Sequence, residues 1–303
     1  MKKKSLLVIG GTGFFGKSIL ASFKRGMLQE FNISKIFVLA RNTDKFRLEF
    51  PELICDFVEL INGDISNICT LPQVDFVIHA ATSTNMNEYN QYTGNAGQNN
   101  IERAVTNYCN IAPLCHSKSK ILYCSSGAVY GKQPLSVETI DENFKFQQDL
   151  STLSVEKQNY CLGKRFAEKE IINLGKSGLS VSIARCFAFF GKYLPKNQHY
   201  AYGNFIGQAE TGETITVKST GLVYRSYLEA DQLVISLMKI LSESEPLCPI
   251  YNVGSDKSIT LHELAETIAK KHGVGWQHNI TNQEVVIDRY VPNIDKLKAL
   301  LSR

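Results

Sequence analysis

The segment Ser5–Lys17 reads SLLVIGGTGFFGK and joins a short apolar run to a turn with glycines at positions 10, 13 and 16. A short apolar run is typical of a buried strand in a parallel sheet, and a helix is expected after the turn. In that geometry the glycines allow a tight turn, close approach of a pyrophosphate to the backbone, and close packing of helix on strand. The unpaired N–H groups that open the helix favour an anion. The pattern predicts a dinucleotide site, although a plain strand–turn–helix unit also satisfies it.

Strand-like and helix-like segments alternate through the first half of the chain. The expected strands are Leu6–Ile9, Lys35–Leu39, Phe57–Ile61, Phe76–His79, Ile121–Cys124 and Val181–Arg185. The expected helices are Lys17–Arg25, Asn99–Ile111 and Ser154–Leu174. This alternation predicts an α/β fold of the Rossmann type, with a doubly wound parallel sheet and helices on both faces.

After about Gly191 the expected elements become shorter. They are helices at Asn204–Thr211 and Leu228–Leu241, a strand at Ile215–Val217, and a strand and turn at Tyr251–Ser255. Thr260 and Glu263 have capping-box spacing at the start of a helix that runs through Lys271. We expect a dinucleotide-binding domain over residues 1–190 and a smaller, partly interleaved α/β substrate domain over residues 191–303. The most linker-like stretch is Pro134–Ser151.

Composition argues against several other classes of protein. The 303 residues are 44% hydrophobic and 20% charged, and the formal charge of +4 is too small and too dispersed for a nucleic-acid-binding stripe. The apolar run Leu6–Ile9 is too short for a signal peptide, and no apolar run has the length needed to span a membrane. The eight cysteines lack C-x-x-C spacing and the six histidines lack metal-ligand spacing. We therefore expect reduced cysteines, no metal, no membrane or nucleic-acid partner, and a cytoplasmic location.

Four polar residues have the spacing of a catalytic group. Ser125 and Ser126 follow the strand Ile121–Cys124, and Tyr160 and Lys164 stand four positions apart on a helix, so their side chains share one face. A phenol with a pKa of about 10 is a poor acid or base at neutral pH, and a neighbouring ammonium lowers that pKa. A serine at the C-terminal end of a strand can hold a reacting oxygen where open α/β sheets bind ligands. Each feature alone also fits a structural role, but their order after the glycine turn is far more specific.

With these motifs in this order, the chain resembles the extended short-chain dehydrogenase/reductases, the NAD(P)-dependent epimerases, dehydratases and reductases that act on nucleotide sugars. The resemblance covers nearly the whole chain. Its marks are GGTGFFG at Gly10–Gly16, GDI at Gly63–Ile65, HAAT at His79–Thr82, SSGAVYG at Ser125–Gly131, YCLGK at Tyr160–Lys164, YRSYLEADQL at Tyr224–Leu233 and YNVGS at Tyr251–Ser255. The family implies a homodimer formed through helices of the large domain, including Asn99–Ile111 and Ser154–Leu174.

The resemblance also implies catalytic and cofactor-binding roles. Tyr160 would donate or accept the proton, Lys164 would bind the nicotinamide ribose and tune that tyrosine, and Ser126, in preference to Ser125, would hold the C4 oxygen of the sugar. Asp64 would contact the adenine. Including the catalytic pair, the cofactor-binding residues would be Gly10, Thr12, Gly13, Phe14, Phe15, Gly16, Arg41, Asp64, Ile65, Ala80, Ala81, Tyr160 and Lys164.

Substrate binding would involve Ser126 and two residues of the C-terminal part. The resemblance implies that Arg225 pairs with the diphosphate of a nucleotide sugar, for which a guanidinium fork is suited, and that the Asn204 amide contacts the substrate. A surface ion pair for Arg225 and a helix-start position for Asn204 fit the sequence as well.

Three departures from the family pattern narrow the expected reaction. Gly127 and Ala128 stand where the 4,6-dehydratases carry Asp-Glu, so we expect no elimination of water. Ala188 stands where many relatives carry an asparagine, which leaves substrate binding at that point undefined. Ala40 and Arg41 end the second strand, where an NAD-selective site has an acidic residue. This favours NADP(H), with NAD(H) as the alternative.

The function expected first is reduction of a 4-keto-6-deoxy nucleotide sugar. The alternative is an NAD-dependent nucleotide-sugar 4-epimerase, which would retain its cofactor through each cycle. A non-catalytic regulator that senses the dinucleotide is a third possibility, and the presence of Ser126, Tyr160 and Lys164 together argues against it.

Overall fold

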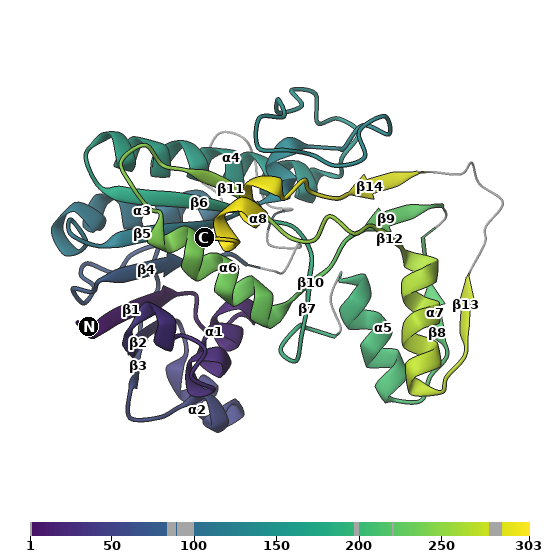
Figure 1. Ribbon diagram of the computed structural model, residues 1–303, viewed down its shortest axis with the longest axis horizontal. Helices are drawn as coiled ribbons and strands as arrows, with labels where there is room; N and C mark the ends of the chain where they lie inside the picture. Colours follow the sequence, from purple (N-terminus) through teal and green to yellow (C-terminus); the bar gives the residue numbers. More distant parts are fainter. Residues whose placement is uncertain (1, 84–88, 90–99, 197–199, 220, 279–286) are drawn as a thin grey trace.

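A seven-stranded parallel sheet forms the centre of the computed structural model, which describes residues 2–83, 89, 100–196, 200–219, 221–278 and 287–303. The strand order is β11-β6-β5-β4-β1-β2-β3 (Figure 1). The strands are β1 (Lys4–Ile9), β2 (Ile33–Ala40), β3 (Val58–Asn62), β4 (Phe76–His79), β5 (Lys120–Ser126), β6 (Ser180–Cys186) and β11 (Ile250–Val253). The order reverses between β1 and β4, which is the switch point of a doubly wound sheet, and the expected fold class is confirmed.

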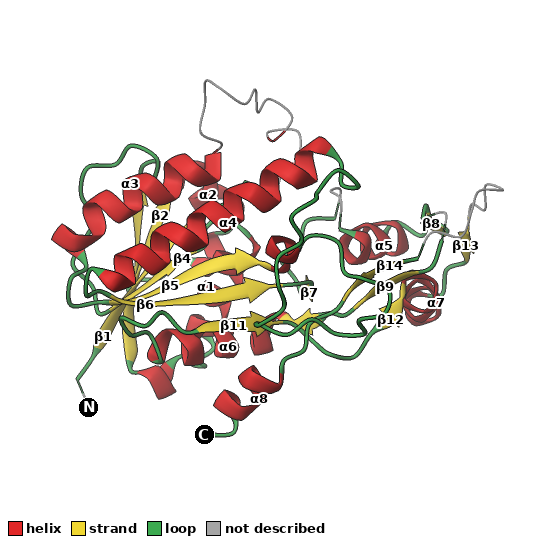
Figure 2. Cartoon of the chain, turned by 90° about the horizontal axis from the view of Figure 1, so that it is seen from above, coloured by secondary structure: helices red, strands yellow, loops and turns green. Residues whose placement is uncertain are grey.

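Helices cover both faces of this sheet. One face carries α1 (Phe14–Lys24), α6 (Ala230–Ser242) and α8 (Asp295–Leu301), and the other carries α3 (Asn100–Cys115) and α4 (Val155–Lys176), as Figure 2 shows. The short helix α2 (Thr43–Glu49) packs beside β3.

The sequence of β1 explains why the sheet needs both layers. Leu6 and Val8 join the core beneath α1 and α6, whereas Leu7 and Ile9 join the core beneath α3 and α4. Successive side chains of a strand point to opposite faces, so a strand that is apolar at every position must be covered on both sides.

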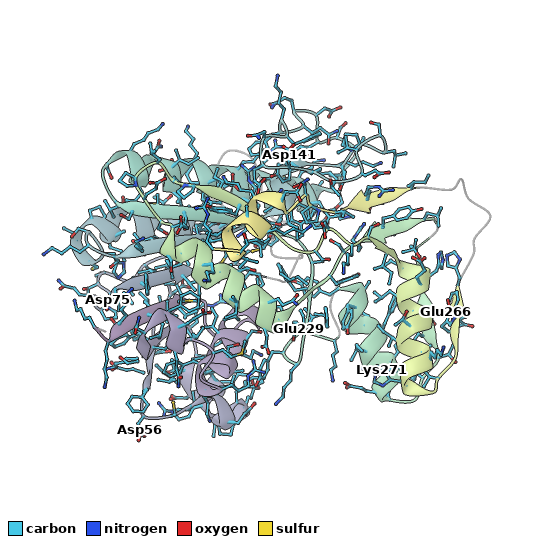
Figure 3. All side chains as sticks on the ribbon, viewed as in Figure 1. Asp56, Asp75, Asp141, Glu229, Glu266 and Lys271 are labelled. Atoms are coloured by element: carbon cyan, nitrogen blue, oxygen red, sulfur yellow. The ribbon has the colours of Figure 1, made fainter. Side chains whose placement is uncertain are left out.

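A smaller part extends from one end of the sheet. It contains α5 (Ala201–Glu210), β8 (Ile215–Val217), β9 (Val223–Arg225), β12 (Ile259–Thr260), α7 (Leu261–His272), β13 (Trp276–His278) and β14 (Asp288–Tyr290). Its own core joins Phe205 on α5, Val217 on β8 and Leu264 on α7. Figure 3 shows Glu266 and Lys271 on α7, away from the large sheet.

The two parts share the C-terminal segments of the chain. α6, β11 and α8 all follow residue 191, yet β11 is a strand of the large sheet and both helices pack on it. In the sequence, β12, α7, β13 and β14 lie between β11 and α8. A further link is the pair β7 (Phe189–Phe190) and β10 (Leu228–Glu229). The division of the chain at residue 191 remains a prediction.

Several element boundaries differ from the expected ones for local reasons. α1 begins at Phe14 because Gly13 is already its N-cap. The expected helix from Leu228 begins at Ala230, because Glu229 caps it by accepting the Asp231 N–H, and residues 228–229 pair with β7. The expected helix start at residue 99 lies outside the described residues.

The capping box of α7 is confirmed. Thr260 Oγ1 accepts the Glu263 N–H at 3.1 Å, and the Glu263 carboxylate accepts the Thr260 N–H at 2.8 Å. This exchange satisfies two N–H groups that a helix start leaves unpaired. Among the described residues, no helix has the length and apolar character needed to cross a membrane.

Candidate active site

The glycine turn after β1 leaves exposed backbone at the start of α1. Gly10 has φ +84°, and a Cβ there would lie 2.7 Å from Ala81 Cα, whereas a Cβ on Gly16 would lie 2.1 Å from the Gly11 carbonyl oxygen. Gly13 is different, because a Cβ there would meet only the Gly10 carbonyl oxygen, at 3.5 Å. Gly10 and Gly16 are therefore required by packing, and Gly13 keeps a surface of the turn open.

The N-terminus of α1 is suited to an anion. Within the part of the chain that the structure describes, no side chain caps α1 and its first turn has no acidic residue. The first N–H groups of the helix and the positive end of its dipole are thus available to a pyrophosphate. These residues fit the phosphate groups of a dinucleotide.

Next to this turn, the ends of β2 and β3 bring the Asp64 carboxylate near the Arg41 guanidinium, and Arg103 on α3 also acts on this carboxylate. Asp64 follows β3 and accepts the Ser66 N–H at 2.8 Å. Burial by itself would raise the pKa of Asp64, but the hydrogen bonds from Ser66 and the charges of Arg41 and Arg103 lower it on balance. Asp64 is therefore a carboxylate at neutral pH, and exposed Arg41 lies within its electrostatic reach.

The other residues expected at the cofactor lie in the glycine turn, at the start of α1, and after β3 and β4. Ala80 and Ala81 follow β4, and Ala81 lies against Gly10. Phe15 packs its ring edge-on against Phe189, with ring centres 5.3 Å apart, so its side chain also contributes to the core beneath α1. Of the remaining three, Thr12 and Phe14 are half-buried and Ile65 is buried.

Lys164 reaches from α4 to the carboxyl ends of the central strands. Its ammonium donates to Thr82 Oγ1 at 2.8 Å, to the Cys124 carbonyl at 2.8 Å and to Tyr123 Oη at 3.3 Å. The side chain is 2% exposed, and burial lowers the pKa of Lys164 to about 8. Its Nζ lies 5.9 Å from the centre of the Tyr160 ring.

Tyr160 and Ser126 meet through their hydroxyl groups. Desolvation raises the pKa of the Tyr160 phenol well above its ordinary value, and the hydrogen bond with Ser126 offsets this only in part. Desolvation thus outweighs the charge effects at this phenol, and the expectation that Lys164 lowers the pKa of Tyr160 remains a prediction. The three N–H groups of Lys164 point to Thr82, Tyr123 and the Cys124 carbonyl.

Ser125 and Ser126 have different surroundings although they are neighbours on β5. Ser125 donates to the buried Glu168 carboxylate at 2.6 Å, whereas Ser126 accepts the Ala128 N–H at 3.2 Å and begins the 3₁₀ turn η4 (Gly127–Tyr130). Only Ser126 stands beside Tyr160 in the described contacts. The role expected for Ser126 remains a prediction.

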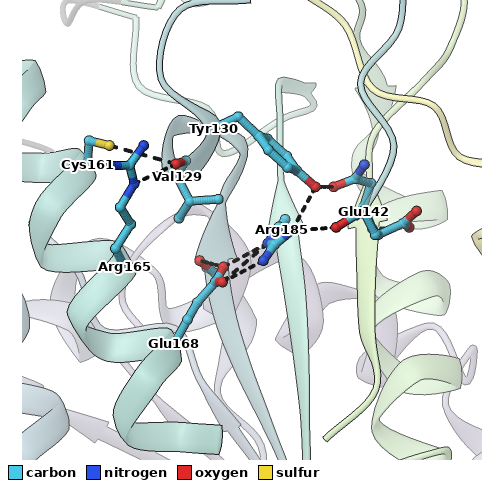
Figure 4. A network of polar contacts seen from close by, with 9 residues as sticks. Val129, Tyr130, Glu142, Cys161, Arg165, Glu168 and Arg185 are labelled. Atoms are coloured by element: carbon cyan, nitrogen blue, oxygen red, sulfur yellow. Dashed lines mark hydrogen bonds and ion pairs between the residues drawn. The ribbon is translucent and has the colours of Figure 1, made fainter. Parts of the chain in front are cut away.

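A buried polar network holds these strand ends in place (Figure 4). Arg185 on β6 donates to Glu168 on α4 at 2.8 Å and to Tyr130 Oη at 2.9 Å, and Tyr130 donates to Asn252 on β11 at 2.8 Å. Removing one partner of a buried ion pair is costly, since the other charge is left uncompensated. The network therefore anchors α4, which carries Tyr160 and Lys164, to the sheet.

Arg225 and Asn204 lie in the smaller part. Arg225 on β9 forms an ion pair with Asp288 on β14 at 2.5 Å and donates to the Tyr224 carbonyl at 2.8 Å. Asn204 lies on α5 and is half-buried. An ion pair is the second role that the sequence allows for Arg225, and the structure contains one. The substrate-binding roles of both residues remain predictions.

The model of the NAD dependent epimerase/dehydratase family matches residues 6–254. The chain belongs to this family. It is thus an enzyme of the NAD-dependent nucleotide-sugar epimerase/dehydratase group. Among the described residues, moreover, no group of three or more His, Cys, Asp or Glu side chains could hold a metal ion.

Similar proteins of this family have several activities. The dTDP-4-dehydro-6-deoxyglucose reductase of Escherichia coli is 27% identical over 304 residues, which span 94% of this chain and 89% of that protein. UDP-glucuronic acid decarboxylase 6 of Arabidopsis thaliana is 27% identical over 268 residues, which span 87% of this chain and 73% of that protein.

Solved structures of the family share the fold. The UDP-glucose 4-epimerase of Thermotoga maritima superposes with a TM-score of 0.76 at 16% identity, covering 97% of this chain and 91% of that one. The dTDP-glucose 4,6-dehydratase of Bacillus anthracis, solved with NAD, has a TM-score of 0.73 at 17% identity, covering 99% and 90%.

Two site residues were not singled out in the sequence. Tyr123 contacts Lys164 and lies on β5. It is buried within an expected strand, where the sequence pattern indicates a core residue and no contact with Lys164. Tyr290 approaches Ser126 from β14, a strand of only three residues with no alternating pattern. Part of the candidate active site of this protein thus comes from β14, a strand too short to be predicted from periodicity.

Proposed function

We propose that this enzyme reduces the C4 ketone of a 4-keto-6-deoxy nucleotide sugar with NADPH. The observation that carries the proposal is the grouping of Ser126, Tyr160 and Lys164 at the carboxyl ends of β4 and β5, beside the glycine turn. The E. coli relative named as a dTDP-4-dehydro-6-deoxyglucose reductase supports it, because its match spans nearly all of both chains.

Each of the three residues would have a separate task. When bound, the reduced dinucleotide would supply hydride to C4. Ser126 would hold the ketone oxygen, and Tyr160 would donate its phenolic proton to that oxygen, so that the ketone becomes an alcohol. A raised pKa keeps the Tyr160 phenol protonated at neutral pH, as a proton donor requires. Lys164 would stabilise the negative charge that develops on the phenol oxygen.

Cofactor preference would depend on Arg41. Its position directly after β2 and its electrostatic effect on Asp64, which the family resemblance assigns to the adenine, support a role near the adenosine ribose. A guanidinium forms strong charge-assisted hydrogen bonds with phosphate. We therefore expect Arg41 to contact the 2′-phosphate of NADPH.

Replacement of Arg41 tests this assignment. Arg41→Ala is expected to weaken NADPH binding by about tenfold and to leave NADH binding unchanged, because only NADPH carries the 2′-phosphate. Titration of dinucleotide fluorescence measures both affinities. Arg47→Ala, at an exposed position of α2, is the matched control. Unchanged NADPH affinity in Arg41→Ala would defeat the assignment.

A second candidate retains its cofactor through the cycle. The relatives named as UDP-glucuronic acid decarboxylases favour it. Such an enzyme would oxidise C4 first, after which a carboxylate two carbons from the ketone can be lost as carbon dioxide, and the ketone would be reduced again. A 4-epimerase would share the first and last of these steps. For either activity, bound NAD⁺ would not be consumed.

One set of assays separates these functions. The purified enzyme is given dTDP-4-keto-6-deoxyglucose with NADPH, and NADPH absorbance is followed; parallel reactions contain NAD⁺ with UDP-glucuronic acid, UDP-glucose or dTDP-glucose. We expect NADPH consumption in the first reaction and no 4-keto-6-deoxy product from dTDP-glucose.

Tyr160→Phe is expected to lower turnover by about 10²- to 10⁴-fold. Xylose or galactose products without net NADPH consumption would favour the second candidate, and indifference to Tyr160→Phe would favour a regulator.

A further inference from the structure

The Thr82 hydroxyl links the segment after β4 to the ammonium of Lys164. It accepts a hydrogen bond from Lys164 Nζ at 2.8 Å, and it donates its own proton to the Ala81 carbonyl at 2.9 Å. Ala81 in turn packs against Gly10, so that a Cβ on that glycine would overlap it. Thr82 therefore connects Lys164 with a segment that lies against the glycine turn.

The donor count of Lys164 shows why this hydroxyl matters. An ammonium has three N–H donors and no acceptor. In Lys164, one donor goes to Thr82 Oγ1 and one to the Cys124 carbonyl, each at 2.8 Å, while the third makes a longer contact of 3.3 Å with Tyr123 Oη. The two short bonds run to different segments, one after β4 and one on β5. Together they fix the direction of the ammonium.

Of these two short bonds, only the one to Thr82 depends on the identity of a side chain. Any residue at position 124 would present a backbone carbonyl, whereas the acceptor at position 82 is the threonine hydroxyl itself. The Lys164 side chain is 2% exposed, so solvent does not readily replace a lost acceptor. A buried N–H group without an acceptor disfavours the charged form of the amine.

We propose that Thr82 is a positioning residue, whose hydroxyl fixes the Lys164 ammonium at the carboxyl ends of β4 and β5 beside the Tyr160 ring. The effect of Thr82 on turnover rests on the proposed function, in which Lys164 assists Tyr160. The hold of Thr82 on the ammonium does not, and it can be measured without any substrate.

Titratable side chains also surround the ammonium, and none of them is altered when Thr82 is replaced. They are His79 on β4, Tyr123 and Cys124 on β5, Cys186 on β6, and Tyr160 and Glu168 on α4. A change in the titration of Lys164 that is confined to variants without the Thr82 hydroxyl therefore reports on that hydroxyl.

NMR titration of Lys164 in the purified protein, without added dinucleotide or substrate, tests the proposal. With ¹³C at lysine Cε, the Lys164 signal is identified as the one that Lys164→Met removes. The pKa of Lys164 predicts a midpoint at about pH 8 in the wild type. Thr82→Val keeps the shape of the side chain and removes the hydroxyl, so we expect the midpoint to fall by about one pH unit. Thr82→Ser should restore the wild-type midpoint.

Thr106→Val, on α3, is the matched control. Thr106 Oγ1 is buried and has no hydrogen-bond partner among the described residues, so the same substitution there removes no hydrogen bond from Lys164. It should leave the Lys164 midpoint unchanged. An unchanged midpoint in Thr82→Val, or a shift of the same size in Thr82→Ser or Thr106→Val, would overturn the proposal.

Turnover gives a second readout. For reduction of dTDP-4-keto-6-deoxyglucose with NADPH, we expect Thr82→Val to lower kcat about tenfold, because a misdirected ammonium supports Tyr160 less well. Thr82→Ser and Thr106→Val should retain full kcat. Full kcat in Thr82→Val would contradict the positioning role. If the wild type turns over none of the nucleotide sugars, the proposed function fails, and the Lys164 midpoint still decides the role of Thr82.

Discussion

At the residue scale, burial changes the acid–base behaviour of the site more than neighbouring charges do. Tyr160 and Lys164 both have their neutral forms favoured, since desolvation raises the pKa of the phenol and lowers that of the ammonium. A phenol that holds its proton suits reduction, in which Tyr160 acts as the acid. The buried ammonium, by contrast, should carry a measurable cost in stability.

That cost should depend on pH. The pKa of Lys164 falls from 10.5 to about 8, so below about pH 8 the charged group destabilises the fold by about 3 kcal/mol. Between these two pKa values the unfolded chain binds more protons, so stability rises with pH and the penalty disappears. The free energy of unfolding of Lys164→Met minus that of the wild type should therefore fall by roughly 2–3 kcal/mol between about pH 7 and pH 10.

Urea unfolding across that range measures the difference. The tyrosines that titrate in this range are present in both proteins. Their contributions to the free energy of unfolding therefore cancel when the two proteins are compared at the same pH. Lys157→Met, at an exposed position of the same helix, is the control and should show a constant difference. A constant difference for Lys164→Met as well would contradict the lowered pKa.

At the element scale, the turn between β1 and α1 assigns different tasks to glycines of one motif. Gly16 lets the helix touch the turn, since any Cβ there would overlap the Gly11 backbone. Gly13 is exposed and has no such neighbour. The sequence predicts all the glycines as one fingerprint, and the packing separates their tasks.

This separation predicts opposite outcomes for two alanine substitutions. Gly16→Ala should destabilise the protein by about 1–3 kcal/mol or more, because backbone must move to admit the methyl group. Gly13→Ala should change stability by less than about 1 kcal/mol and weaken NADPH binding by about tenfold, since its methyl group would stand where a phosphate approaches. Urea unfolding and fluorescence titration distinguish the two variants. Equal loss of stability would refute the distinction.

At the scale of the whole molecule, α4 contributes side chains both to the candidate active site and to the outer surface of the protein. Tyr160 and Lys164 face the sheet, while Val155 and Leu162, seven positions apart, are 56% and 45% exposed on the outer side. On the neighbouring helix α3, Leu114 is 77% exposed. Exposed apolar side chains on adjacent helices fit the homodimer that the family resemblance implies, which remains a prediction.

A charge placed on this surface should separate the subunits. Leu162→Glu is expected to convert a dimer to a monomer, because burying an unpaired carboxylate in an interface is unfavourable. Size-exclusion chromatography with light scattering measures the mass of each species. Leu48→Glu, on α2 and 82% exposed, is the control and should remain dimeric. A monomeric wild type would rule out the dimer.

Most of the large sheet was predictable because its inner strands are buried on both faces. Each expected strand from Leu6–Ile9 to Val181–Arg185 overlaps one of β1 to β6, and the segment at Tyr251 became β11. By contrast, β9, β12 and β14 have two or three half-buried residues each. Such strands contain too few residues for any period to appear.

By itself, the sequence determined the α/β alternation, the glycine turn and the placement of Tyr160 and Lys164 on one helix face, because these depend on residues close together in the chain. Only the tertiary structure decided which serine meets Tyr160, that Lys164 points to Thr82 and the Cys124 carbonyl, and that Tyr290 reaches Ser126. Those contacts join residues separated by tens to more than a hundred positions. They depend on how the buried polar network and the smaller part of the molecule position the ends of the strands. No local sequence pattern encodes contacts between residues so far apart in the chain.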